Sequence, residues 1–195
     1  YIDGQDPVQT QDIENVRKAL SVCSDEILAH APIFYIRSDE GHFKYDHFGE
    51  TGIASAHYCN SIPRKICLRP YNIYESTIWH EIAHLRADTL SGSEAVRELY
   101  WRWEKIAGSV YGKSDADCRK DGLVSAYSRK NSGEDIAEFY CHCMQKLYNQ
   151  WGDWELTANP YLKTDSRYLK KFELLYKYKF FTDEQYAKLK PLFWP

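Results

Sequence analysis

The sequence predicts an α+β fold, with a small mixed sheet packed on a helix and further helices at the C-terminus. Helical apolar spacing covers residues 11–30, short β-branched and aromatic runs fill 33–70, and helical periodicity returns after residue 72. At 195 residues the chain can bury one core. We expect a single domain over 1–195. Its parts are an N-terminal helix and small sheet (about 11–70), the helices that carry the motifs described below (about 72–150) and a helical tail (about 160–195).

The N-terminal part contains one predicted helix and three predicted strands. Apolar residues recur at helical spacing between Gln11 and His30, which predicts one amphipathic helix there. The run "IFYIR" at 33–37 is typical of a buried strand. The runs "GIASAHYC" at 52–59 and "RKICLR" at 64–69 predict two more strands around a turn. A small sheet follows from these three segments.

The rest of the chain is predicted to be mainly helical. Residues 73–85 have an apolar side and end near Gly92, and a second helix follows with an apolar stripe at Val96, Leu99, Trp103, Ile106 and Val110. After a polar loop at 112–133, Ser132 and Asp135 resemble a capping box that opens a third helix. Two aromatic-rich helices are expected at 166–180 and 182–193.

Charge and hydropathy bear on partners and location. A net charge of −3 gives no field that would hold nucleic acid or an anionic membrane, and no apolar run reaches the roughly 18 residues of a membrane span. We expect neither partner, and we expect a monomer. A start at Tyr1 without a signal-peptide pattern fits a processed, secreted or extracellular protein. It also fits the catalytic domain of a longer precursor or an intracellular effector.

Six cysteines leave two interpretations open. An even count allows up to three disulfides in an oxidising compartment, and Cys59 and Cys67 could link adjacent strands. The alternative is six buried thiols that pack as small hydrophobic side chains.

The segment "HEIAH" indicates a metal site. His80 and His84 lie four residues apart on a predicted helix, so their imidazoles can meet at one point. Glu81 lies beside that face and is better placed to bond a metal-bound water than to bind the ion. This is the arrangement of zinc hydrolases, in which a third protein ligand completes the site.

The third ligand must come from elsewhere. Metzincins are excluded because Ala87 and Leu90 stand where their motif needs Gly and His. Glu134 and Glu138 are four residues apart on the third helix, so one could bind the ion while the other braces a ligand histidine. Asp88 is the alternative ligand.

The remaining histidines have weaker claims. His142 lies between two cysteines, but successive residues diverge around a helix and cannot converge on one ion. His57 lies in a predicted strand without a spaced partner, and His42 and His47 are expected in loops.

"HEIAH" followed by "AYSRKNSGEDIAE" resembles the anthrax lethal factor-like group of gluzincin metallopeptidases, which includes the Pro-Pro endopeptidases. The resemblance covers roughly residues 53–145. It implies a zincin-like fold with Glu134 as third zinc ligand. It also implies that Tyr127 donates a hydrogen bond to the oxyanion. Glu138 would then contact a zinc-binding side chain without binding the ion itself.

These observations lead to a zinc-dependent endopeptidase that holds one Zn²⁺ ion and cleaves a peptide or protein substrate. Glu81 would accept the proton of the attacking water. The strand at 64–69 could be an edge to which substrate adds, as in the resembling family. A zinc hydrolase of a non-peptide amide or ester, a non-catalytic zinc-stabilised binding module, and the catalytic part of a toxin or effector remain alternatives.

Overall fold

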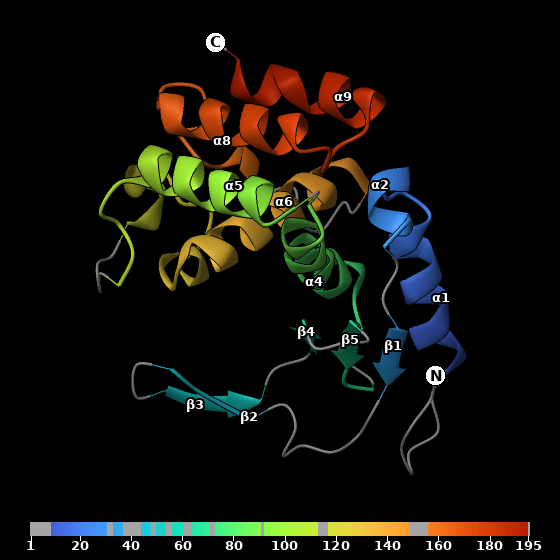
Figure 1. Cartoon of the computed structure of the whole chain (residues 1–195). Coiled ribbons are helices and arrows are strands. Elements are labelled where there is room, and N and C mark those ends of the chain that lie inside the picture. Colours follow the sequence, from blue (N-terminus) through green and yellow to red (C-terminus); the bar gives the residue numbers. More distant parts are fainter. Residues whose placement is uncertain are drawn as a thin grey trace.

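A computed structural model describes residues 9–30, 33–36, 44–47, 50–53, 56–60, 64–70, 73–90, 92–112, 117–148 and 156–194. The protein is α+β and mostly helical, as predicted. In Figure 1 the C-terminal helices form an upper layer, the central helices lie below them, and the strands lie at the bottom. Among the described helices, none combines the length and the apolar character needed to cross a membrane.

The predicted N-terminal helix is two helices, α1 (Thr10–Leu20) and α2 (Asp25–Leu28), so the expectation of one helix over 11–30 is wrong. The break follows from local chemistry. Ser24 has extended backbone angles, and its side chain accepts a hydrogen bond from the backbone N–H of Ile27. A serine cap in that conformation begins a new helix instead of continuing the old one.

A three-stranded mixed sheet confirms the small sheet expected from the sequence. Its strands are β1 (Ile33–Ile36), β4 (Ala56–Cys59) and β5 (Lys65–Leu68), in the order β1-β5-β4. β5 runs parallel to β1 and antiparallel to β4. The expectation that 64–69 forms an edge is therefore wrong, because β5 is hydrogen-bonded on both sides. Among the described strands of this sheet, β1 and β4 are the edges.

A two-stranded hairpin accompanies this sheet. It pairs β2 (Lys44–His47) with β3 (Glu50–Ile53), so the single strand predicted over 52–59 is divided between two sheets. The backbone of His47 lies in β2 and not in a loop, whereas His42 lies outside the described residues.

Two helices from distant parts of the sequence pack together at the centre of the molecule. They are α4 (Glu75–Asp88), which also contacts β4, and α6 (Ser132–Tyr148). The cap expected from Ser132 is wrong, because Asn131 Oδ1 accepts the backbone N–H of Glu134. The Ser132 hydroxyl instead donates to Glu104. This Asn131 cap fixes the first turn of α6, which contains Glu134.

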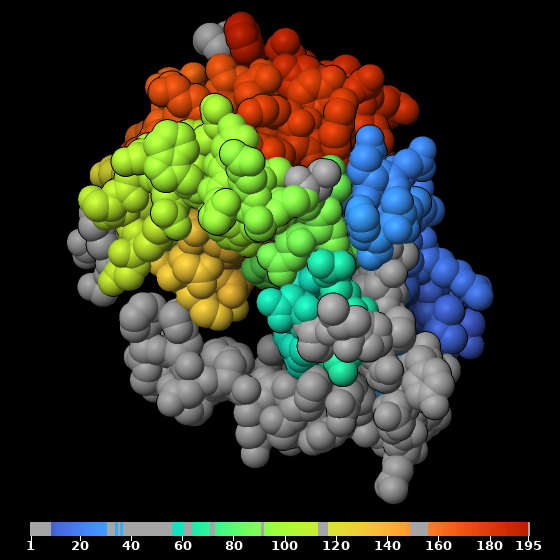
Figure 2. Space-filling view, in the orientation of Figure 1, coloured from blue at the N-terminus to red at the C-terminus, as the bar shows by residue number. Residues whose placement is uncertain are grey.

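The remaining helices surround α6. They are α5 (Gly92–Ala107), the short helical turns η1 (Cys118–Asp121) and η2 (Tyr127–Arg129), α8 (Ser166–Lys177) and α9 (Asp183–Phe193). The two C-terminal helices confirm the prediction for the tail. One hydrophobic cluster extends from Ala19 on α1 to Phe193 on α9. Figure 2 shows the α8 and α9 surface covering one end of the molecule, in red.

Candidate metal centre

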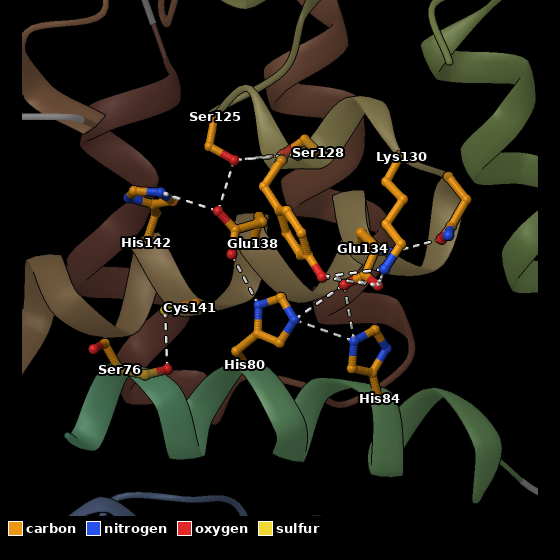
Figure 3. Close-up of polar contacts among 12 residues, drawn as sticks. Ser76, His80, His84, Ser125, Ser128, Lys130, Glu134, Glu138, Cys141 and His142 are labelled. Carbon is orange, nitrogen blue, oxygen red and sulfur yellow. Dashed lines mark hydrogen bonds and ion pairs between the residues drawn. The ribbon is translucent and has the colours of Figure 1, made fainter. Parts of the chain in front are cut away.

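Two facing helices bring the predicted ligands together. His80 and His84 project from successive turns of α4, and Glu134 and Glu138 project from successive turns of α6 (Figure 3). Buried apolar side chains, including Ile78 on the same helix, anchor α4 in the core. The polar residues of both helices therefore lie in one shared seam.

Three atoms form a nearly equilateral triangle in this seam. His80 Nε2 lies 3.1 Å from Glu134 Oε2 and 3.2 Å from His84 Nε2. The distance from His84 Nε2 to Glu134 Oε2 is 3.3 Å. Together the three residues form a group that could hold a metal ion.

The size of the triangle can be compared with coordination geometry. A tetrahedral zinc ion binds nitrogen and oxygen at about 2.0–2.1 Å, which separates neighbouring ligand atoms by about 3.3–3.4 Å. The observed separations of 3.1, 3.2 and 3.3 Å lie close to this value. An ion of that size would need only a small outward movement of the side chains.

The other nitrogen of His80 is fixed by Glu138. Nδ1 lies 2.8 Å from Glu138 Oε1. The second oxygen of Glu138 accepts the Ser125 hydroxyl at 2.6 Å and lies 3.8 Å from His142 Nε2. Glu138 is thus held between several groups while it orients the His80 ring, which is the role expected of it from the sequence.

This arrangement leaves acceptors facing one another. A neutral imidazole that donates through Nδ1 presents a lone pair at Nε2. In His80 that lone pair points to a carboxylate oxygen of Glu134 and to the second imidazole. Such atoms repel at hydrogen-bond distance unless a positive charge lies between them, and either a proton on His80 or a bound metal ion can supply that charge.

The titration behaviour of these groups follows from the same geometry. Burial alone lowers the pKa of His80, but the carboxylates of Glu134 and Glu138 outweigh it and raise this pKa to about 10. Burial alone raises the pKa of Glu134, but His80 and His84 hold it well below its usual range. The pKa of Glu138 is likewise low, since hydrogen bonds from His142 and His80 outweigh burial. Together the three shifts favour a protonated His80 between two ionised glutamates, in the absence of a metal ion.

Glu81 lies beside the triangle in a drier setting. It is 7% exposed, and burial raises the pKa of its carboxyl against the opposing charges of His80 and His84. A backbone hydrogen bond from Tyr58 on β4 also holds this carboxylate. A carboxyl group whose pKa is raised towards neutrality is better suited to accept and return a proton.

Tyr127, the first residue of η2, and Lys130, which directly follows η2, approach Glu134. The Tyr127 hydroxyl donates to Glu134 Oε1 at 3.5 Å, and Lys130 Nζ lies 3.2 Å from that hydroxyl and 3.1 Å from the same carboxylate oxygen. Tyr127 is 45% exposed. Burial and the charge of Glu134 raise its pKa, so it remains a phenol and can donate a hydrogen bond.

Figure 2 shows the surface hollowed between the yellow segment around η2 and the teal residues of β4 and β5. The exposed Tyr127 has its ring 6.0 Å from the His80 ring, and β4 contacts α4. The side chains of the triangle are 13–21% exposed, so the triangle is partly accessible to solvent.

The alternative ligands do not join the triangle. Among the described residues, Asp88 belongs to no group able to hold a metal, although its carboxylate interacts with His84. His142 points to Glu138, whereas the Cys141 thiol donates to the Ser76 carbonyl oxygen, so this pair diverges as expected.

Two supporting residues were missed from the sequence, and one interpretation was incomplete. Lys130 lies four residues before Glu134, a spacing that could have indicated contact on a helical segment. Ser125 has no such signal, because it reaches Glu138 from a bend. His57 has partners after all, since it forms a second group able to hold a metal with Cys59 and Cys67. All six cysteines are thiols in the structure.

Comparison with protein-family models and with curated proteins finds no match for this chain. The geometry of the seam is therefore the basis on which a function is proposed for this chain.

Proposed function

We propose that this protein is a zinc-dependent endopeptidase of the gluzincin type, with a zincin-like fold. The observation that carries the proposal is the triangle formed by His80, His84 and Glu134 with Glu81 beside it. A site needed only for structure would require neither a buried carboxyl next to the ion nor a phenol above it.

The residues fit zinc by chemistry and by distance. Two imidazoles and one carboxylate are the ligand set of a catalytic zinc site with an open fourth position. When bound there, the ion would act as a Lewis acid and lower the pKa of its water towards 7. Glu138 would keep the His80 ring in the tautomer that directs Nε2 to the ion.

Glu81 would transfer the protons of the reaction. In its dry position beside the histidines, its carboxylate would accept a proton from the attacking water and return it to the leaving amine. Because burial raises the pKa of Glu81, this carboxyl group holds a proton more tightly than an ordinary glutamate does. That property serves both steps.

Tyr127 would stabilise the oxyanion that develops on the peptide carbonyl. Its hydroxyl already lies above Glu134, and its exposed position leaves room for substrate beside it. Lys130 would hold the phenol in place through its contact with the hydroxyl oxygen. Removal of one such donor commonly costs about 3–4 kcal/mol of transition-state stabilisation.

β4 replaces the segment at 64–69 as the strand to which substrate could add. β4 is an edge of the described mixed sheet, it contacts α4, and its Tyr58 backbone reaches Glu81. An extended peptide bound along that edge would pass the triangle through main-chain hydrogen bonds. This mode of binding favours a peptide over a compact ester or amide.

The experiment is digestion of a diverse peptide library by the zinc-loaded protein, read by mass spectrometry. Glu81→Gln should reduce cleavage by about 10²–10⁴-fold while zinc content stays at the wild-type level. Glu94→Gln, an exposed change on α5, is the matched control and should cleave like wild type.

The alternatives give different results. Zinc binding without cleavage of any peptide would contradict the proposal and favour a binding module or a hydrolase of another bond. Equal cleavage by wild type and Glu81→Gln would also contradict it, because the assigned base would then be unnecessary.

A further inference from the structure

We propose that His57, Cys59 and Cys67 form a second metal site, which binds a thiolate-preferring divalent ion such as Zn²⁺ and fastens β4 to β5. This inference does not depend on the proposed peptidase activity. The site uses different residues, a different part of the fold and different ligand chemistry from the seam between α4 and α6.

Strand register places the three side chains on one face of the sheet. His57 and Cys67 are directly paired across β4 and β5, and Cys59 follows His57 by two residues. Because side chains alternate along a strand, residues 57 and 59 share a face, and the paired residue 67 shares it too. The three residues are therefore neighbours by backbone geometry alone.

This face is opposite to the one that packs on the helices. Ile66 and Leu68, which flank Cys67 in β5, belong to the main hydrophobic core together with Ile78 of α4. Cys67 is 1% exposed but is not part of that core cluster. His57 and Cys59 are half-buried, so the cluster has a buried base and a rim that an ion can reach.

The donor atoms suit a borderline-soft ion. One imidazole nitrogen and two sulfurs lie within 4.8 Å of one another. Zinc binds thiolate at about 2.3 Å, which separates two sulfurs on a tetrahedron by about 3.8 Å. Mixed sulfur and nitrogen ligands of this kind favour zinc over magnesium or calcium, with a fourth position left for water or another donor.

The same register makes a disulfide unsuitable. Cys59 and Cys67 are diagonal neighbours, because the residue paired with Cys59 is Lys65. Diagonal positions in an antiparallel pair are about 7–8 Å apart between Cα atoms, whereas a disulfide needs about 4.4–6.8 Å. An ion between the sulfurs spans that gap without movement of the strands.

A metal at this position would hold an edge strand in register. β4 is paired with β5 over four residues and carries Tyr58, whose backbone reaches Glu81. A short edge strand is a weakly held element of a sheet. Coordination across β4 and β5 would limit its fraying and keep Tyr58 beside the helix.

The experiment is a Co²⁺ titration of the reduced, metal-free full-length chain in the His84→Ala background, which lacks one ligand of the other site. Sulfur ligation gives a thiolate-to-cobalt charge-transfer band that nitrogen and oxygen ligands cannot give. We expect this band with one bound ion per chain. The double change Cys59→Ser/Cys67→Ser should abolish it, and Cys118→Ser, another half-buried cysteine, is the matched control that should retain it.

Circular dichroism would check that each variant is folded, and His57→Ala gives a second test at the partly exposed rim. Absence of the band in folded His84→Ala protein would overturn the proposal, as would a band that survives in the double variant Cys59→Ser/Cys67→Ser. A Cys59–Cys67 disulfide found by mass spectrometry in protein purified with zinc would also overturn it. Failure of the peptidase proposal would appear separately. The zinc-loaded wild-type protein would then cleave no peptide, while the cobalt band of His84→Ala would be intact.

Discussion

Glu134 and Asp135 are consecutive residues of α6 that serve opposite purposes. Glu134 points to two histidine nitrogens at 3.1 and 3.3 Å, where acceptor atoms converge. Asp135 points into the helical layer, where its Oδ2 accepts from Trp103, Tyr111 and Lys171 at 2.7, 2.9 and 2.6 Å. Glu134 turns one oxygen to the two imidazoles and the other to the partly exposed Lys130, whereas Asp135 is paired with a fully buried lysine.

The difference separates a candidate site from a structural cluster. Asp135 and Lys171 have side chains that are 0% exposed, and the pair joins α6 to the C-terminal helix α8. A buried charge is tolerated only when it is paired and hydrogen-bonded. The seam around Glu134 is partly open and brings titratable groups with strongly shifted pKa values together, which is typical of a functional site.

The largest effect should come from breaking the structural cluster. Lys171→Met leaves the Asp135 charge buried, and we expect a loss of about 3–5 kcal/mol in the free energy of unfolding. Denaturant titration measures it. Adding Asp135→Asn should restore part of the loss, and Lys188→Met in an exposed pair should change the free energy of unfolding far less. A small effect of Lys171→Met would contradict the comparison.

Tyr127→Phe tests the role of the partly exposed seam around Glu134. If Tyr127 donates to the oxyanion, the rate constant kcat should fall by about 10²–10³, while unfolding changes little because the side chain is half-exposed. Peptide turnover and denaturant unfolding of the same samples measure both quantities. An unchanged kcat would remove Tyr127 from the mechanism.

Tyr111→Phe is the matched change in the buried cluster around Asp135. Its hydroxyl donates to Asp135 in the same way that Tyr127 donates to Glu134. A hydrogen bond to a charged group is worth about 1.5–3 kcal/mol, so we expect that loss in the free energy of unfolding with kcat preserved. The opposite pattern in these two variants would reverse the roles assigned to the two carboxylates.

The smallest effect concerns the support of His80. Ser125→Ala removes the hydroxyl that donates to Glu138 at 2.6 Å, and zinc affinity should fall about tenfold, the lower end for such supporting residues. Competition with a chelator of known affinity measures it. Ser132→Ala, which removes a hydroxyl bonded to Glu104, should leave the affinity unchanged.

Local spacing allowed part of the site to be predicted. His80 and His84 are neighbours on any helix that contains both, and so are Glu134 and Glu138, because helical geometry alone fixes residues four apart. The helices themselves followed from apolar periodicity, as the tail helices α8 and α9 show. The choice of Glu134 as third ligand came from the resemblance.

Pairings between distant segments were not predictable in this way. The sequence contains His57, Cys59 and Cys67, but only the register of β4 on β5 places them together, and only the position of β5 between two strands moves the edge to β4. The Asp135–Lys171 pair likewise joins two residues 36 positions apart, on α6 and α8. The sequence by itself determined which residues share a helix face, because that depends on local geometry. The tertiary structure decided which faces meet, because that depends on how the whole chain buries its apolar surface.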